Sequence, residues 1–189
     1  ICNNNTGDYM TLSNDLEENY KHFKNDFVDC SDFLVRKAKV GDKKLFFAAC
    51  DGLIDSLQLS QMVVSPILKS EDISIDNIKN SITNCVELNE AKTFADCYYY
   101  IMSGFAVAVV DGENIALAFG IQNPPSRSVD EPTNEESTKA PKEAFVEILN
   151  TNKALLRKRL KTPHLKLKQI KLASAAPAPC VIAYMDDRA

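Results

Sequence analysis

FAVAVVDGENIALAF, residues 105–119, contains the strongest hairpin signal in this 189-residue sequence. Two apolar runs, Phe105 to Val110 and Asn114 to Phe119, flank the turn residues Asp111-Gly112-Glu113. A short polar loop containing glycine between two such runs is typical of a β-hairpin. Both runs are apolar almost without interruption, which favours strands that are buried on both faces.

A second hairpin is predicted upstream, where the runs Phe33 to Val40 and Lys44 to Cys50 flank Gly41-Asp42. Hydrophobic spacing predicts helices around this hairpin. The elements expected before residue 105 are a helix over 13–24 capped by Ser13, a helix over 53–68 that Pro66 stops or bends, a short helix around 75–82, a short strand over 85–88, and a helix over 90–102 capped by Asn89.

Composition changes after the central hairpin. Gln122 to Lys139 is rich in Pro, Ser, Glu, Asn and Thr and has no hydrophobic periodicity, so it predicts a stiff linker. Pro141 is expected to open a helix with an apolar face formed by Phe145, Ile148, Leu149, Leu155, Leu156 and Leu160, which Thr162-Pro163 ends. Strands follow over 166–172 and 181–185, with a bulge or strand end near Gln169.

The expected fold class is therefore mixed α/β (α+β), with mixed sheets packed by helices. We expect a flexible N-terminal segment at 1–12, a first subdomain at 13–121, a Pro-containing linker at 122–139 and a second subdomain at 140–189 that ends before its natural boundary. Because the first 14 residues lack a secretory pattern and no apolar run reaches the roughly 20 residues of a spanning helix, we expect a soluble chain.

Chemical motifs are missing from the sequence. With six scattered cysteines and two histidines, it predicts buried free thiols in a reducing compartment rather than disulfides, and no metal site or cofactor. His22 lies four residues after Glu18, which favours a solvated helical pair over a general base. Asp51 and Asp111 each precede glycine, which favours ordinary turns over paired catalytic carboxylates. We therefore expect no enzyme.

The segment from Ile148 to Met185 contains no Asp or Glu but many lysines and arginines. A solvated helix end, a docking surface for an acidic partner or anionic lipid, and a nucleic-acid site are all consistent with this charge. Nucleic acid is disfavoured because aromatic residues do not interleave with the cations. Arg157 and Arg159 project about 160° apart on a helix. We expect one of them to pack inward onto Glu131 or Glu135, and the other, with Lys158 and Lys161, to face a partner.

Other polar residues complete the candidate ligand or interface set. Asn152 falls on the predicted apolar face of its helix, where it either holds a neighbouring loop backbone or contacts a ligand. Arg127 in the linker is expected to form ion pairs or hydrogen bonds with nearby acids. The candidate set is Arg127, Glu131, Glu135, Glu147, Asn152, Arg157, Lys158, Arg159 and Lys161.

The stretch PPSRSVDEPTNEESTKAPKEAFVEILNTNKALLRKRLKTPHLKLKQI, residues 124–170, resembles the signature of GerA-type spore germinant receptor A subunits. Weaker resemblance covers Cys50 to Asp55, Asp111-Gly112 and Val181 to Tyr184. Ala140 and Ala144 stand where the family has glycines, and Lys139 and Lys142 where it has arginines. The matching positions in the main stretch are Ser126, Arg127, Glu131, Pro132, Glu135, Lys139, Pro141, Lys142, Glu143, Phe145, Asn152, Arg157, Arg159, Leu160 and Pro163.

The resemblance implies a large N-terminal domain of a membrane protein that assembles with B and C subunits, and with other A subunits, in the spore inner membrane. It implies a cytoplasmic domain near an anionic membrane surface. It also implies a response to a small nutrient, an amino acid or a sugar, that triggers germination. The paralogous stage V sporulation protein AF shares the same segment, and a nucleic-acid-binding module using the basic helix is the alternative of another class.

Overall fold

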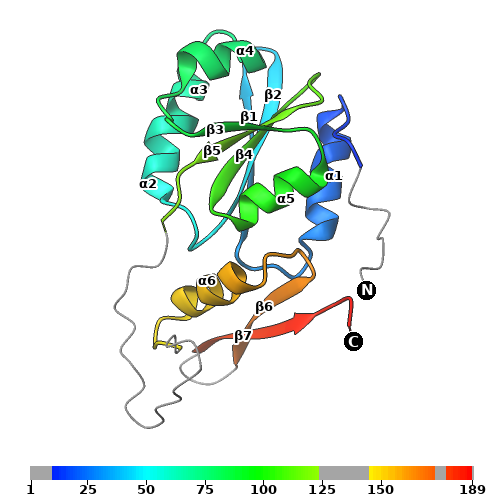
Figure 1. Cartoon of the computed structure of the whole chain (residues 1–189), viewed down its shortest axis with the longest axis vertical. Coiled ribbons are helices and arrows are strands. Elements are labelled where there is room, and N and C mark those ends of the chain that lie inside the picture. The colour runs from blue at the N-terminus through cyan, green and yellow to red at the C-terminus, as the bar shows by residue number, and fades with distance from the viewer. Residues whose placement is uncertain (1–9, 124–144, 173–177, 189) are drawn as a thin grey trace.

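A computed structural model describes residues 10–123, 145–172 and 178–188, which form two antiparallel sheets with covering helices (Figure 1). We call residues 10–123 the N-terminal unit and the described residues from 145 onward the C-terminal unit. The elements are α1 (Leu16–Asp26), β1 (Phe33–Val40), β2 (Lys43–Cys50), α2 (Ser56–Gln58), η1 (Leu59–Val64, π-helical), α3 (Ser65–Lys69), α4 (Ile75–Asn77), η2 (Ile78–Ile82, π-helical), β3 (Leu88–Ala91), α5 (Phe94–Met102), β4 (Phe105–Val110), β5 (Ala116–Gly120), α6 (Leu149–Arg159), β6 (Leu165–Leu172) and β7 (Ala178–Met185).

The N-terminal unit is built on a five-stranded sheet with the order β1-β2-β4-β5-β3. Both predicted hairpins are confirmed, since β1 pairs with β2 and β4 pairs with β5. Every residue of β4 is buried, as the apolar run predicts. The turn residues Gly41 and Gly112 have φ angles of +58° and +84°, a left-handed conformation that glycine adopts readily.

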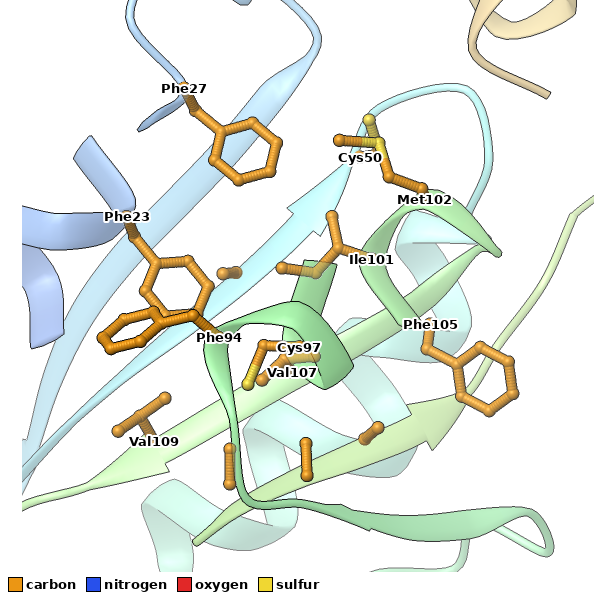
Figure 2. Packing of buried hydrophobic residues seen from close by; sticks show 14 of the residues in the cluster. Phe23, Phe27, Cys50, Phe94, Cys97, Ile101, Met102, Phe105, Val107 and Val109 are labelled. Atoms are coloured by element: carbon orange, nitrogen blue, oxygen red, sulfur yellow. The ribbon is translucent and has the colours of Figure 1, made fainter. Parts of the chain in front are cut away.

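Side chains alternate between the two faces of a strand, so the apolar sequence of β4 places apolar side chains on both faces of the sheet. Helices cover both faces and bury these side chains. Val107 and Val109 point to one face, where the helices α1 and α5 supply the aromatic core around Phe23 and Phe94 (Figure 2). The neighbouring residues of β4 point to the opposite face, which the segments α2 to η2 cover with isoleucines such as Ile67 and Ile78. The double burial predicted from the sequence therefore reflects two separate helical layers.

The C-terminal unit contains α6 and the antiparallel pair β6–β7, which lie together at one end of the five-stranded sheet (Figure 1). The register runs without interruption from Leu165–Met185 to Leu172–Ala178, so the predicted bulge or strand end near Gln169 is wrong. The mixed α/β fold class is confirmed. The sheets themselves are not the mixed sheets that we expected. Within the described residues the paired strands are antiparallel, and a parallel pairing occurs at an isolated bridge between Cys30 and Leu167.

Two predicted helix starts are wrong because other residues cap better. Asp15, not Ser13, caps α1, and its carboxylate accepts hydrogen bonds from the backbone of Glu17 and Glu18. Asn89 caps nothing, since it lies in β3 opposite Ala118. Thr93 instead caps α5 through a reciprocal capping box with Asp96.

Two other predicted helices are correct in place but not in extent. Pro66 does not stop its helix, because it lies in the first turn of α3 after the π-helical segment η1, where a missing N–H is tolerated. The last helix begins at Leu149, because Ile148 is extended with φ −84° and ψ 110°. Phe145 and Ile148 are therefore exposed rather than part of an apolar face, and Pro141 lies outside the described residues.

The ends of the N-terminal unit reach further than the sequence predicted. Thr11 pairs with Thr93 and Leu12 is buried, although we expected a flexible segment up to residue 12. Gln122 pairs with Ile54, so the first two residues of the predicted linker belong to this unit. The division into two subdomains otherwise stays a prediction, and most of the linker lies outside the described residues.

Candidate functional site

The junction between the two units is held by a buried ion pair between Arg157 of α6 and Asp32, which precedes β1. The Arg157 Nε and Nη2 atoms donate to the two Asp32 carboxylate oxygens at 2.8 and 3.0 Å. The Arg157 Nη1 atom donates to the Thr162 carbonyl at 2.8 Å. Both side chains are almost fully buried, at 0% and 1% exposure. This pair therefore fixes α6 against the N-terminal unit with fork-shaped geometry.

Asp32 stabilises the charge of Arg157. Burial disfavours the charged guanidinium of Arg157, but the hydrogen bonds and the charge of Asp32 outweigh burial, so the pKa of Arg157 is raised. The Cys50 thiol donates to Asp32 Oδ2 at 3.2 Å. Burial, and then the charge of Asp32, raise the pKa of Cys50 well above its usual range. Cys50 is thus a protonated donor to the pair rather than a nucleophile.

Backbone contacts join the same two units. The Leu167 N–H donates to the Asp29 carbonyl at 3.0 Å, and the Ser31 N–H donates to the Leu167 carbonyl at 3.1 Å. Gly52, two residues after the end of β2, has a φ angle of +80°, and a Cβ atom there would lie 3.1 Å from Ala154 Cβ of α6. The Asp51-Gly52 turn therefore needs glycine both for its conformation and for the close approach of α6.

A groove of about 580 Å³ opens at the junction, between the helices α1 and α5 on one side and the α6–β6 turn with the end of β7 on the other. Tyr98 and Tyr99 line it from α5, while Lys161 and His164 line it from the C-terminal unit. Its volume falls within the roughly 300–1,000 Å³ that small-molecule sites occupy. The groove is thus large enough for a small ligand that touches both units.

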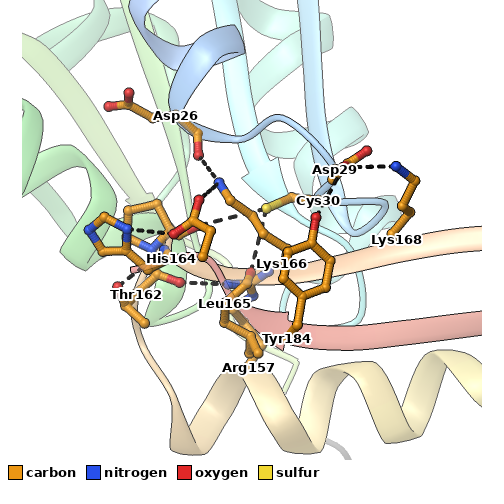
Figure 3. Close-up of polar contacts among 12 residues, drawn as sticks. Asp26, Asp29, Cys30, Arg157, Thr162, His164, Leu165, Lys166, Lys168 and Tyr184 are labelled. Atoms are coloured by element: carbon orange, nitrogen blue, oxygen red, sulfur yellow. Dashed lines mark hydrogen bonds and ion pairs between the residues drawn. The ribbon is translucent and has the colours of Figure 1, made fainter. Parts of the chain in front are cut away.

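A polar network frames one wall of this groove (Figure 3). The buried Lys166 Nζ donates to the Asp26 carbonyl at 2.7 Å and pairs with Asp186 Oδ2 at 3.1 Å. The His164 Nδ1 atom lies 2.8 Å from Asp186 Oδ1. Partial burial raises the pKa of Asp186, but the hydrogen bonds from His164 and Lys166 outweigh it, and the pKa is lowered. Asp186 is therefore held as a carboxylate.

The other wall carries a tyrosine–aspartate pair. The Tyr98 hydroxyl donates to Asp26 Oδ2. Burial, and then this bond to a carboxylate, raise the pKa of Tyr98, so the phenol stays protonated. On the outer side of the junction, Lys168 and Tyr184 both bond Asp29 Oδ2 at 3.1 Å. These bonds, that of Lys168 first, lower the pKa of Asp29.

The structure places the predicted site residues in different settings. Asn152 holds a loop backbone, since its Oδ1 accepts from the Val146 N–H at 2.8 Å and its Nδ2 donates to the Val146 carbonyl at 2.6 Å. Glu147 and Lys158 are exposed. Lys161 donates to Ser103 Oγ at 3.1 Å, which joins it to the N-terminal unit.

The two arginines of the basic helix differ as the helical geometry predicts. Arg157 is the one that packs inward, and the carboxylate that receives it is Asp32 rather than the expected Glu131 or Glu135. Arg159 is exposed and takes part in an interaction of its own. The remaining predicted site residues, Arg127, Glu131 and Glu135, lie outside the described residues.

Sequence reasoning missed the acidic half of the junction. Asp32 precedes a strand and Asp26 ends a helix, and neither position forms part of a motif. Lys166 lies in an alternating strand, where a cation normally faces water, yet it is 6% exposed. Only one signal was present: the Ile148–Met185 segment has no acid of its own, so a buried arginine there requires a carboxylate from elsewhere in the chain.

One group of potential metal ligands appears at the rim of the groove. Among the described residues, His164, Asp186 and Asp187 place one ligand atom each within 4.8 Å of one another. The Lys166 ammonium already neutralises Asp186, and His164 already bonds it. Asp187 pairs with Arg188 at 3.9 Å. Each of the three side chains therefore has a protein partner, so we assign no metal to this group.

The fold and the junction define a mixed α/β domain in which a groove lies between the two units. Within residues 10–123, 145–172 and 178–188, no helix combines the length and apolarity needed to cross a membrane. Residues 21–189 match the family described as Bacillus/Clostridium GerA spore germination protein. Because this match covers most of the sequence, the chain belongs to the GerA family.

Individual relatives agree with this assignment. Spore germination protein B1 of Bacillus subtilis (strain 168) is 30% identical over 184 residues, which are 94% of this chain and 38% of that protein. Spore germination protein KA of the same organism is 25% identical, over 93% of this chain and 34% of that protein. Stage V sporulation protein AF is 27% identical, over 90% and 36% respectively. The chain thus spans little more than a third of these relatives.

A solved structure shares the fold. The N-terminal domain of the A subunit of the Bacillus megaterium spore germinant receptor GerK3 superposes with a TM-score of 0.65 at 24% sequence identity. The match covers 93% of this chain and 66% of that one. The described fold is therefore that of a germinant receptor A-subunit N-terminal domain, as the resemblance of residues 124–170 indicated.

Proposed function

We propose that this chain acts within the A subunit of a spore nutrient-germinant receptor, where it takes part in germinant sensing, receptor assembly and signal transduction. The observation that carries the proposal is the buried Arg157–Asp32 pair, which joins two units beside a groove. Family membership gives the biological setting. A domain that transmits a signal needs two parts whose relative placement is defined, and a buried, fork-shaped ion pair defines it.

The exposed cations of the C-terminal unit support a role in assembly. Lys158, Lys168 and Lys171 are exposed, and Lys158 lies one residue from the buried Arg157. Like charges gathered on one unit attract an acidic surface. In this proposal that surface belongs to the B or C subunit or another A subunit, or to anionic headgroups on the cytoplasmic side of the spore inner membrane.

The proposed role involves no catalysis. Among the described residues, the thiol that contacts a carboxylate is Cys50, and its raised pKa is the opposite of what a nucleophile needs. The His164–Asp186 pair is committed to Lys166. A sporulation role like that of stage V sporulation protein AF is the second candidate, because that protein is similar over nearly the same span.

Charge reversal in the full receptor tests the proposal. Arg157→Glu places two carboxylates in one buried site, so we expect loss of the folded domain and of the receptor. Lys158→Glu changes an exposed neighbour, so we expect a folded domain with impaired co-purification of the B and C subunits or an impaired germination response. Normal assembly and germination with Lys158→Glu would return the basic helix to a solvated face.

A further inference from the structure

The five-stranded sheet ends at β1. One side of β1 pairs with β2, and its other side pairs with no strand among the described residues. About half of the N–H and C=O groups of an edge strand point outward, where another extended chain can form hydrogen bonds with them. Because β1 is eight residues long, this edge offers several backbone groups to a partner.

A groove of about 350 Å³ lies beside this edge, between β1, β2 and the segment from α2 to η1. Leu34 and Phe47 line it from the two strands, and Leu59 and Val64 line it from the helical side. Leu34 is 43% exposed although it is a large apolar residue. The helical layer therefore leaves apolar surface uncovered next to the open edge, where a single apolar side chain of a partner can be buried.

The opposite face of the β1–β2 hairpin carries lysines. The strand register places Lys39 directly opposite Lys44, and both line a second hollow of about 410 Å³ near the start of α1. Like charges that face each other across two strands are destabilising. Lys37, on the same face, bonds to Glu17 at 2.6 and 2.8 Å. A carboxylate placed near Lys39 and Lys44 would relieve their repulsion in the same way.

The hairpin carries more positive charge than its neighbours neutralise. Two of its lysines pair with Glu17 and Asp72. Within residues 10–123, 145–172 and 178–188, the side chains of Arg36, Lys39 and Lys44 form no hydrogen bond or ion pair. Arg36 borders the apolar groove, and the two lysines lie on the other face. The charge of this edge is therefore complementary to an acidic partner.

Lysines on an edge strand also protect a sheet from pairing with other sheets. Protection of that kind requires charge alone. At this edge the charge accompanies a groove and an exposed Leu34, and such apolar surface promotes association. A second copy of β1 is a poor partner, because it would bring the same cations together. The combination favours recognition of an acidic strand.

The register of β1 determines the pattern that such a strand must carry. Side chains of an added strand alternate between the two faces, and each lies beside the β1 residue that it faces. An apolar residue that faces Leu34 reaches the groove. The residue two positions away faces Arg36 on the same face of the sheet, and the residue five positions away faces Lys39 on the other face.

We propose that the edge of β1 binds an extended acidic segment of another polypeptide, which adds to the sheet as a further strand. One apolar side chain of this segment occupies the groove, and acidic side chains two and five positions away meet Arg36 and Lys39. The surface belongs to the N-terminal unit and is separate from the basic end of α6. It deepens the assembly role of the proposed function and rests on that role.

Two fluorescein-labelled peptides test this surface by fluorescence polarisation with the 189-residue chain. One peptide is Thr-Leu-Thr-Glu-Thr-Thr-Glu-Thr and the other is its reverse, because an added strand is either parallel or antiparallel to β1. We expect one of them to bind. Its affinity should fall about tenfold when threonine replaces the leucine, and about tenfold when glutamines replace both glutamates. Absence of binding by both peptides, or an affinity that either change leaves unaltered, overturns the proposal.

N-methylation separates strand addition from attraction between charges alone. Methyl groups on alternate amides remove the donors that face β1 in one version of the peptide and the donors that face solvent in the other version. We expect one version to lose binding and the other to keep it within about twofold. Equal effects of the two versions contradict strand addition.

Substitutions at exposed positions locate the surface. Leu34→Thr should weaken binding of the peptide about tenfold, and Arg36→Gln combined with Lys39→Gln should do the same. Lys92→Gln removes an exposed lysine next to β3, at the other edge of the sheet, so its affinity stays unchanged. Circular dichroism checks that each variant is folded. Equal weakening by Lys92→Gln contradicts the assignment to β1.

Two controls test other occupants. Vesicles of phosphatidylglycerol and phosphatidylcholine test a membrane surface, and sedimentation equilibrium tests a second copy of the chain. Vesicle binding that needs Arg36 and Lys39 while neither peptide binds, or self-association that Leu34→Thr abolishes, assigns the edge to that occupant and overturns the proposal.

Failure here and failure of the proposed function are distinguishable. If neither peptide binds but Lys158→Glu still impairs receptor assembly or germination, the β1 surface is wrong and the receptor role stands. If a peptide binds with the expected losses while both charge-reversal variants germinate normally, the surface stands and the receptor role is wrong.

Discussion

Removing the guanidinium of Arg157 tests the junction most sharply in the isolated domain. Arg157→Met keeps the length of the side chain and its apolar contacts but deletes three hydrogen bonds, two to Asp32 and one to Thr162. The Asp32 carboxylate, at 1% exposure, then remains buried, and within the described residues it keeps the hydrogen bond from the Cys50 thiol. Leaving one member of a buried ion pair without its partner costs about 3–5 kcal/mol.

This magnitude is large relative to the stability of a domain, which is typically about 5–15 kcal/mol. Chemical denaturation followed by far-UV circular dichroism measures it, since the chain contains no tryptophan for fluorescence. The matched control is Lys43→Met, which breaks an exposed pair with Asp72 at 3.5 Å. Exposed pairs contribute about 0–1 kcal/mol, so the control should be nearly neutral.

The double variant Arg157→Met with Asp32→Leu separates a charge effect from a packing effect. With both charges replaced by apolar side chains, no buried carboxylate is left alone, and we expect most of the lost stability to return. If Arg157→Met costs no more than Lys43→Met, the pair does not hold the junction. If the double variant is less stable than either single variant, the cost lies in packing and not in the orphaned charge.

Three further outcomes follow from the described contacts. Asn152→Ala deletes two hydrogen bonds to the backbone of Val146, each worth about 0.5–1.5 kcal/mol. Chemical denaturation should therefore show that the free energy of unfolding falls by about 1–3 kcal/mol. An unchanged free energy of unfolding would mean that other contacts hold the loop. Gly52→Ala and Gly112→Ala both strain a residue in the left-handed conformation, but only the Cβ atom at position 52 also contacts α6. Thermal unfolding should therefore show a larger drop in melting temperature for Gly52→Ala. Equal drops would contradict the close packing of α6 on this turn. The pKa of Asp186 is lowered from 3.8, so its bonds stabilise the fold above that pH, and this stabilisation is lost as the pH falls through the lower pKa of the folded state. Asp186→Asn should therefore make the free energy of unfolding depend less on pH in the acid range. An unchanged pH dependence would refute this.

The sequence was sufficient for the local elements of the N-terminal unit. Both hairpins have a glycine turn between apolar runs, and this signal depends only on residues that are near one another in the chain. Asn89 shows where local reasoning fails. It is a good cap in isolation, but pairing with Ala118 of β5 places it in a strand, and such pairing is decided by distant residues.

The candidate site could be predicted only in part for the same reason. Helical geometry showed that one of Arg157 and Arg159 had to point inward, because both could not face one surface. The identity of the buried partner, Asp32, depends on a contact across 125 positions of sequence, which no spacing rule reports. Asp26 and Lys161 line one groove through the same long-range docking, so the sequence alone does not bring them together.

We propose that the two units must be joined at Arg157 and Asp32 for the receptor to work. The direct measurement is nutrient-triggered germination of spores whose receptor carries Arg157→Met, alone or with Asp32→Leu, with receptor abundance measured in the same spores. We expect the single variant to lose receptor and response together, and the double variant to regain both. A normal germination response with Arg157→Met alone would contradict the claim.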